Sequence, residues 1–317
     1  MTIKEIPLII NGEKVRSKTD TWLDVLNPAT QEVVARVPMA TKEEVDAAVA
    51  CAATAFKSWS KVSLTNRMRI MLTFQQLVRE NSQELAELVT LEHGKTLPDA
   101  EGEVGRALEA IENACSVTRL QLGEMANNAA TGVDTYTLNK PLGVGVGITA
   151  FNFPLMLPAF MFPPAIACGN TFVLKPSEQD PSSTIRFVEL ALEAGIPPGV
   201  LNVVHGGPDA VNQLIESDAV KAVSFIGSTT VGTHVYNHAS KHGKRAQAMM
   251  GAKNHMVIMP DANKDRAIND LLGSAFGAAG QRCMANPVTI LVGETREWLP
   301  EIVERAKLMK VGPGTQR

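Results

Sequence analysis

The chain has 317 residues, of which 45% are hydrophobic and 20% are charged, and its formal net charge is −3 at pH 7. This is the composition of an ordinary globular protein, long enough for one large or two moderate domains. The near-neutral balance of charge does not favour nucleic acid or an acidic membrane surface as a partner, and we expect neither.

The first part of the chain predicts β-structure followed by helices. Asn11-Gly12 stands between two short apolar runs within residues 7–16, which is the signal for a tight β-hairpin, and a second strand–turn segment follows. Thr41 and Glu44 have the spacing of a capping box at a helix start. From there to about residue 119, apolar residues recur every three or four positions, which predicts amphipathic helices.

After about residue 132 the pattern changes to strands that alternate with helices. Residues 135–151 predict extended chain, and the apolar stretch 153–168 predicts a buried connection leading into a buried helix. This stretch contains prolines and is too short to span a bilayer. The alternation over 172–243 predicts a parallel α/β sheet with right-handed crossovers and helices on both faces, whose ligands bind at the carboxyl ends of the strands.

A third region starts near Gly251. Residues 267–283 predict a helix or helix–turn, 288–293 a strand and 298–312 a helix. One strand and two helices do not close a domain. We therefore expect a first domain over 1–250 and an incomplete second domain over 251–317.

Two glycine-rich segments resemble nucleotide-binding motifs. GVGVG at 143–147 is followed by Pro-rich chain, so it does not have the context of a dinucleotide fingerprint, and GSTTVG at 227–232 has Thr233 where a P-loop needs Lys. The second segment does run from a strand into a helix start, which suits a phosphate. Lys175 and Glu178 follow a strand and are placed to hold ribose hydroxyls, although spacing alone favours a surface turn with a solvated ion pair.

The four cysteines are irregularly spaced, and only one has the sequence context of a nucleophile. They are Cys51, Cys115, Cys168 and Cys283. Their spacing excludes a CxxC pair and favours free thiols in a reducing compartment. We expect a cytoplasmic location. Cys283 follows Arg282 and several small residues, which leave room for a substrate and supply a cation for a thiolate. A buried structural thiol is the alternative for Cys283, and we assign that role to the other three.

Three histidines are a possible metal site. His234, His238 and His242 recur every fourth residue on one helical face, but no HExxH and no nearby carboxylate completes the set of ligands. We therefore expect a polar helix face and no metal.

Five ordered segments together resemble the aldehyde dehydrogenase superfamily, over essentially the whole chain. They are AFNFP (150–154), NTFVLKPSE (170–178), GIPPGVLNVVHG (195–206), AVSFIGST (222–229) and GQRCMA (280–285). GAKNHMVIMPDAN (251–263) and LEHGKTLPDAEGEV (91–104) are similar to the CoA-acylating methylmalonate-semialdehyde dehydrogenases in particular. Family members are longer, so the resemblance implies a C-terminally truncated member with a parallel Rossmann-type NAD-binding sheet.

The resemblance also implies roles for individual residues. Cys283 would attack an aldehyde, and Asn152 with the Cys283 backbone N–H would form an oxyanion hole. The residues that would line the NAD site are Thr149, Phe151, Lys175, Glu178, Gln179 and Ser228. Arg106 and Arg282 would bind a substrate carboxylate, for which a guanidinium is suited. The alternatives are a helix-surface charge for Arg106 and, for Arg282, only a lowering of the thiol pKa.

One departure from the superfamily pattern points to coenzyme A as co-substrate. Hydrolytic members carry Glu at the position of Met249, and that Glu activates water, whereas a thioether accepts no proton. A thioester on Cys283 would then persist until CoA attacks it, which implies acyl-CoA products from malonate or methylmalonate semialdehyde. The alternatives are a hydrolytic enzyme and an inactive NAD-binding fragment. We also expect a homo-oligomer, a tetramer in full-length relatives, paired through a strand near 132–146.

Overall fold

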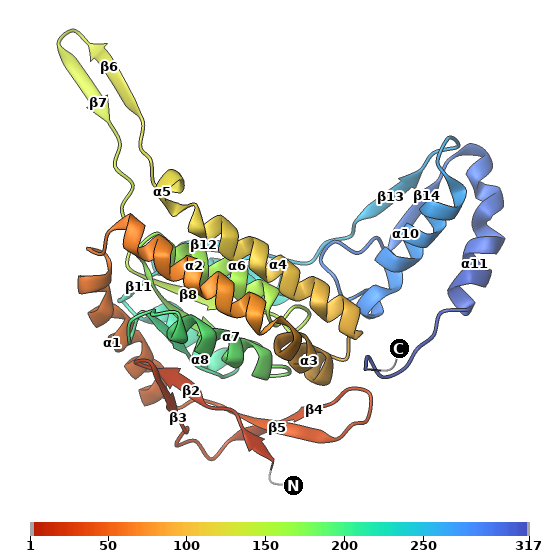
Figure 1. The fold of residues 1–317 in the computed structure, drawn as a ribbon, viewed down its shortest axis with the longest axis horizontal. Helices are drawn as coiled ribbons and strands as arrows, with labels where there is room; N and C mark the ends of the chain where they lie inside the picture. The colour runs from red at the N-terminus through yellow and green to blue at the C-terminus, as the bar shows by residue number, and fades with distance from the viewer. Residues whose placement is uncertain (1–2, 316–317) are drawn as a thin grey trace.

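The structure, a computed structural model, describes residues 3–315 and is built around a seven-stranded sheet (Figure 1). The strands lie side by side in the order β12 (Arg245–Met249), β11 (Val220–Ile226), β8 (Val144–Ile148), β9 (Thr171–Lys175), β10 (Leu201–Val203), β2 (Leu8–Ile10) and β3 (Glu13–Val15). The first five are parallel, and the β2–β3 hairpin adds two antiparallel strands at one edge. The predicted parallel α/β architecture is confirmed.

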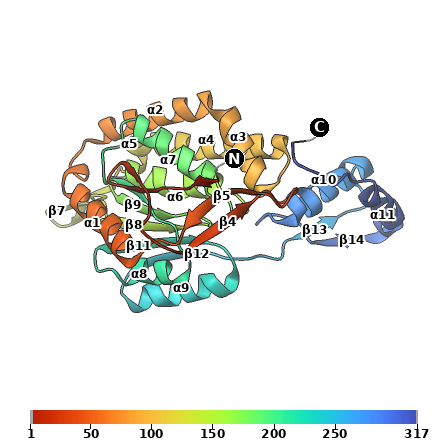
Figure 2. The ribbon, with the colours of Figure 1, turned by 90° about the horizontal axis from the view of Figure 1, so that it is seen from below.

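Helices cover both faces of the sheet, as Figure 2 shows. One face carries α6 (Met156–Ala167) and α7 (Ser182–Glu193), and behind these lie α2 (Leu64–Glu80), α3 (Ser82–His93), α4 (Leu97–Cys115) and the short α5 (Val117–Leu120). The other face carries α1 (Lys42–Trp59), α8 (Pro208–Glu216) and α9 (Thr229–Lys241). Every residue of β8 and β9 is buried, as expected for strands covered on both faces.

Four residues of the GVGVG segment, 144–147, lie in strand β8, where Gly145 and Gly147 have a packing role. A Cβ on Gly147 would lie 2.7 Å from Cε1 of Phe172 on the neighbouring strand, and a Cβ on Gly145 would lie 3.1 Å from the same ring. The Phe172 ring thus occupies the space that side chains on β8 would fill. The segment precedes a loop and then α6, so its glycines are explained without a nucleotide.

The N-terminal predictions are confirmed in detail. Asn11 and Gly12 both have positive φ, 55° and 81°, as the hairpin between β2 and β3 requires. Thr41 accepts a hydrogen bond from the Glu44 N–H, and the Glu44 carboxylate accepts one from the Thr41 N–H, which completes the capping box of α1. The second strand–turn segment is β4 (Trp22–Leu26) and β5 (Val33–Pro38), which form a small sheet with β1 (Lys4–Glu5).

The extended chain predicted over residues 135–151 is divided between two sheets. Its start belongs to β7 (Val133–Tyr136), which pairs with β6 (Met125–Ala130) in a separate hairpin whose strand residues are all exposed. Figure 1 shows this hairpin projecting away from the body of the molecule. The remainder enters the central sheet as β8, because its small and apolar residues suit a strand buried on both faces.

Residues 251–315 form a second lobe at one end of the molecule (Figure 1). It contains two parallel strands, β13 (His255–Ile258) and β14 (Val288–Leu291), so the prediction of a single strand there was wrong. The lobe also holds α10 (Lys264–Phe276), α11 (Leu299–Lys307) and 3₁₀ turns at Gly277–Gly280 and Gly293–Trp298. Near the C-terminus the Gly314 carbonyl accepts a hydrogen bond of 3.1 Å from the Leu97 N–H at the start of α4.

No helix in residues 3–315 is both long enough and apolar enough to cross a membrane.

Candidate active site

The predicted site residues lie at the carboxyl ends of the parallel strands. The chain leaves β8 toward β9 on one side and leaves β11 toward β12 on the other, so a crevice opens between β8 and β11. Such a switch in strand order is where open α/β sheets bind ligands. The loop after β8 carries Thr149, Phe151 and Asn152, and the loop after β11 carries Ser228.

A cavity of about 620 Å³ in this crevice contains the candidate nucleophile. Its lining includes Cys283, Asn152, Phe151, Ser228 and Met249. Cys283 is exposed and free, whereas the other three cysteines are half-buried. The structure thus places the thiol and the predicted oxyanion donor around the same space.

Asn254 holds the segment that bears Cys283. Its Nδ2 donates to the backbone carbonyls of Cys283 at 2.8 Å and of Ala285 at 2.9 Å. The sequence analysis did not select Asn254, although it lies within the quoted segment 251–263. The contact joins positions 29 residues apart, and helix or strand periodicity gives no sign of such a pair.

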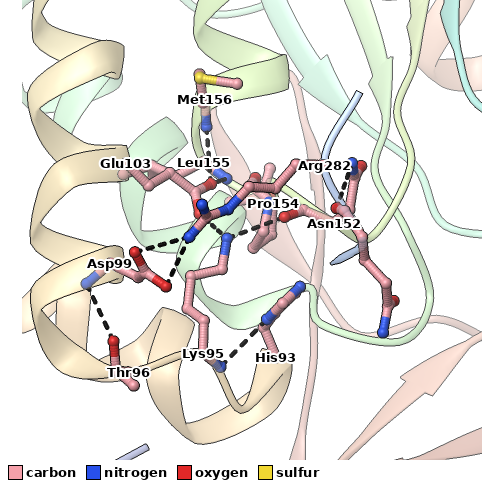
Figure 3. A network of polar contacts seen from close by, with 12 residues as sticks. His93, Lys95, Thr96, Asp99, Glu103, Asn152, Pro154, Leu155, Met156 and Arg282 are labelled. Atoms are coloured by element: carbon pink, nitrogen blue, oxygen red, sulfur yellow. Dashed lines mark hydrogen bonds and ion pairs between the residues drawn. The ribbon is translucent and has the colours of Figure 1, made fainter. Parts of the chain in front are cut away.

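Asn152 is held from both its side chain and its backbone. Its Nδ2 donates to the Gln281 carbonyl at 3.0 Å, next to the nucleophile segment. Its own carbonyl accepts a bond of 2.9 Å from Lys95, whose Nζ also pairs with Glu103 at 2.6 Å (Figure 3). The sequence analysis did not identify Lys95 or Glu103 as part of the site.

A second cavity, of about 770 Å³, contains five of the six predicted cofactor residues: Thr149, Lys175, Glu178, Gln179 and Ser228. The sixth, Phe151, lines the nucleophile cavity, and the two cavities share Ser228, Gly227, Ile226 and Ala150. They therefore adjoin one another along the crevice.

The second cavity has groups that suit a nucleotide. Within the described residues, the buried Thr149 Oγ1 has no hydrogen-bond partner, and a buried hydroxyl is stabilised when a ligand satisfies it. Ser228 is the N-cap of α9, and a helix N-terminus favours a phosphate. Lys175 and Glu178 form an ion pair with each other at the end of β9. Lys175 is almost fully buried in that pair, so it is not the solvated surface turn that spacing alone favours.

The two arginines meet at a third cavity, of about 360 Å³, that Lys95, Phe153 and Glu103 also line. Arg106 is exposed and pairs with Glu109 at 2.8 Å on the surface of α4. Arg282 is more enclosed, and its Nη2 donates to both carboxylate oxygens of Asp99 at 2.8 Å. Asp99 thus occupies the position that a bound carboxylate would take on Arg282, and the sequence analysis did not identify it.

A half-buried histidine, His93, and a buried aspartate, Asp180, line one cavity together with Phe151. Burial and the nearby Lys95 lower the pKa of His93 to about 4, so its imidazole is neutral at pH 7 and lies against the Phe151 ring at 6.3 Å between centroids. Burial raises the pKa of Asp180 well above its ordinary value, and the nearby Ser177 hydroxyl offsets only part of that rise.

The histidine series lies on α9, on one face as predicted. The His234 and His238 rings stack with centroids 5.4 Å apart, and their Nε2 atoms contact Asn212 at 2.8 Å and Glu216 at 3.0 Å. Between residues 3 and 315, no group of three or more His, Cys, Asp or Glu side chains is arranged to hold a metal ion.

The chain belongs to the aldehyde dehydrogenase family, which its residues 14–317 match. Within that family it is similar to proteins named methylmalonate-semialdehyde/malonate-semialdehyde dehydrogenase [acylating], mitochondrial. It is 50% identical to the human protein over 315 residues, which are 99% of this chain and 59% of the human protein. It is 51% identical to the methylmalonate-semialdehyde dehydrogenase [acylating], mitochondrial, of Arabidopsis thaliana, over 98% of this chain and 51% of that protein.

Solved structures show the same relationship. The methylmalonate-semialdehyde dehydrogenase of Oceanimonas doudoroffii superposes with a TM-score of 0.96 at 44% identity, over 99% of this chain and 65% of that one. A putative methylmalonate-semialdehyde dehydrogenase from Sinorhizobium meliloti 1021, solved as an NAD complex, superposes with a TM-score of 0.96 at 44% identity. The match covers 99% of this chain and 64% of that one. The chain therefore spans less than two thirds of the length of these relatives.

Proposed function

We propose that this chain carries the nucleophile and the cofactor cavity of an NAD-dependent, CoA-acylating dehydrogenase of malonate or methylmalonate semialdehyde. The observation that carries the proposal is that Cys283, Asn152 and Met249 line one cavity, which adjoins the predicted NAD cavity. The relatives are named as acylating dehydrogenases of these semialdehydes, which supports the same assignment.

Cys283 supplies the nucleophile for covalent catalysis. The thiol gives its proton to solvent, its sulfur forms a bond to the aldehyde carbon, and the carbonyl oxygen becomes an oxyanion as the C=O π bond opens. Asn152 Nδ2 is a donor at the same cavity, and a preorganised donor there stabilises the charge as it develops. Bound NAD would accept the hydride that converts this adduct to a thioester. The groups that would hold it are Thr149, Lys175, Glu178, Gln179, Ser228 and Phe151.

Met249 determines which nucleophile releases the acyl group. It stands at the end of β12, on the cavity wall where hydrolytic members of the family have a glutamate. A thioether accepts no proton from water, so hydrolysis lacks its base. The CoA sulfur forms the new bond to the acyl carbon, the Cys283–carbon bond breaks, and the product is acyl-CoA. The bond to the carboxylate then breaks with release of CO2, and the enolate that remains takes a proton from water to give propionyl-CoA or acetyl-CoA.

The substrate carboxylate is proposed to bind at the arginine cavity. Arg282 presents a guanidinium that already holds one carboxylate, that of Asp99, by two bonds at 2.8 Å. Both bonds come from the one nitrogen Nη2, whereas a carboxylate held bidentately would bond to two nitrogens of the guanidinium. The semialdehyde must therefore either share Arg282 with Asp99 or displace it, while the exposed Arg106 supplies a second charge.

A cytoplasmic location is also proposed, on the four free cysteines alone. A homo-oligomer is part of the same proposal. The β6–β7 hairpin and the residues after it expose Met125, Tyr136 and Leu138, each at more than 65% of its surface. Large apolar side chains on a projecting hairpin are typical of a contact surface. Light scattering on the wild type and on Tyr136→Asp tests this: a homo-oligomer that dissociates in the variant is expected, and a monomeric wild type would contradict it.

A chain that binds NAD without turnover is a second candidate, favoured by the 59% of the human relative that the chain spans. NADH absorbance with malonate semialdehyde, with and without CoA, separates the candidates. We expect CoA-dependent turnover that Cys283→Ala abolishes and that the matched control Cys115→Ala leaves intact. Turnover indifferent to CoA would refute the acylating assignment. Stabilisation by NAD with no NADH formation would establish the second candidate.

A further inference from the structure

Lys95 and Glu103 form an ion pair that is almost completely removed from water. The Lys95 Nζ lies 2.6 Å from the Glu103 Oε2, and their side chains are 1% and 0% exposed. Burying two charges costs much of what their attraction returns, so a buried pair is weak evidence for stability in itself. The remaining contacts of the two groups therefore indicate what the pair does.

Both members of the pair bond to one short segment, residues 152–156, that carries Asn152. The Lys95 Nζ donates to the Asn152 carbonyl at 2.9 Å and lies 4.3 Å from the centre of the Phe153 ring. The Glu103 Oε1 accepts bonds from the Leu155 N–H at 2.8 Å and the Met156 N–H at 3.1 Å. Figure 3 shows the pair between α4 and this segment.

The charges match the backbone groups that they contact. The cation meets a carbonyl oxygen, and the anion meets the two N–H groups at the start of α6, where no side chain of α6 itself caps the helix. A carboxylate is favoured at a helix N-terminus, and bonds to charged groups are stronger than neutral ones. Both charges act on the same few residues, so they fix the path of the chain from Asn152 into α6.

We propose that Lys95 and Glu103 are positioning residues that hold Asn152 for its work as oxyanion donor. The inference rests on the proposed function, in which Asn152 Nδ2 stabilises the oxyanion on the Cys283 adduct. With its carbonyl fixed by Lys95, Asn152 reaches toward the nucleophile segment and contacts the Gln281 carbonyl at 3.0 Å. Loss of either charge frees the segment at one end and lets the Nδ2 move.

The test must separate positioning from simple support of the fold. In the double variant Lys95→Met/Glu103→Leu, apolar side chains replace the pair, a change that is often neutral for stability, yet every bond to residues 152–156 is lost. Glu103→Gln is the single variant. Glu44→Gln is the matched control, because Glu44 is also buried and accepts bonds from the Ser17 hydroxyl at 2.7 Å and the Lys18 N–H at 2.8 Å.

Two measurements are made on each variant, on Asn152→Ala and on the unsubstituted chain. Hydrogen exchange reports protection of the Leu155 and Met156 amides. NMR with malonate semialdehyde, ¹³C-labelled at its aldehyde carbon, reports the adduct on Cys283 in the absence of NAD, with Cys283→Ala as the blank. Neither measurement depends on turnover.

We expect the double variant to lose protection at these amides and to weaken the adduct roughly tenfold, as Asn152→Ala does, because a small displacement of a donor removes much of its effect. Glu103→Gln keeps an amide oxygen that can accept from both N–H groups, so it should lose less protection and weaken the adduct less than the double variant does. Glu44→Gln should do neither. Unchanged protection, or an unweakened adduct where Asn152→Ala weakens it, would overturn the positioning role. If the unsubstituted chain forms no adduct, the proposed function fails for this chain, and exchange alone decides whether the pair positions the segment.

Discussion

Replacing Gly147 by alanine tests how tightly the sheet is packed under the site. The added Cβ would lie 2.7 Å and 2.9 Å from two atoms of the Phe172 ring and 3.0 Å from the Met161 sulfur. Real Cβ contacts are longer, so the buried ring must shift by several tenths of an ångström. Overpacking of this kind typically costs about 1–3 kcal/mol. We expect equilibrium urea unfolding of Gly147→Ala to show that loss with an unchanged m-value.

Two further variants make this result interpretable. Gly102 lies within α4 with nothing within 4 Å of its Cβ position, so Gly102→Ala should instead stabilise the chain by about 0.5–1 kcal/mol. Phe172→Leu removes the ring. In a chain that already carries Phe172→Leu, Gly147→Ala should therefore cost less stability, and the coupling free energy between the two substitutions should exceed about 0.5 kcal/mol. If Gly147→Ala unfolds at the wild-type urea concentration, the packing explanation of the GVGVG segment is wrong.

Three further predictions concern the reaction and the pH dependence of stability. Met249→Glu should give NADH formation without CoA, since a carboxylate on the cavity wall supplies the base for water; continued dependence on CoA would contradict the role of Met249. Burial lowers the pKa of His205 to about 4, so the neutral ring stabilises the fold above about pH 6.5, and that stability is lost as pH falls from there toward 4. In His205→Gln the urea midpoint should change less between pH 7 and pH 5 than it does in the wild type, and an equal change in the two proteins would contradict this. Burial raises the pKa of Asp180, so the folded state holds its carboxyl proton more tightly than the unfolded state does, and the free energy of unfolding falls as pH rises above the ordinary pKa of an aspartate. Asp180→Asn should therefore raise the melting temperature more at pH 8 than at pH 5, and an equal change at both would contradict this.

Local patterns predicted much of the fold. The Asn11-Gly12 hairpin and the Thr41–Glu44 capping box depend on neighbouring residues alone, and both are present. The alternation of strands and helices over 172–243 predicted the parallel sheet, because each element carries its own periodicity. The resemblance, carried by whole motifs, named the residues that line the two main cavities.

Other parts of the structure have no local signal. Strand β12 alternates between exposed and half-buried residues at the edge of the sheet, so its sequence RAQAM has no apolar run to mark it. The Asp99–Arg282 contact joins positions 183 residues apart, and the Lys95 bond to Asn152 joins positions 57 apart. Such pairs arise only when separate elements pack together. Nothing in the spacing of charges along α4 separates Glu103 from the solvated acidic residues beside it.

The N-terminus of α4 also donates a hydrogen bond, from the Leu97 N–H to the Gly314 carbonyl, so this helix contacts the second lobe as well as the donor segment. The first turns of α4 contact the second lobe at two points 32 residues apart, at Asp99 through Arg282 and at Leu97 through Gly314. One turn further on, Glu103 holds the segment of Asn152. Adjacent turns of one helix therefore contact both the second lobe and the segment that carries Asn152. We expect a substitution that breaks the Asp99–Arg282 contact to change hydrogen exchange at Leu155 and Met156 as well as in the lobe, and unchanged exchange at these amides would show that α4 does not couple the two.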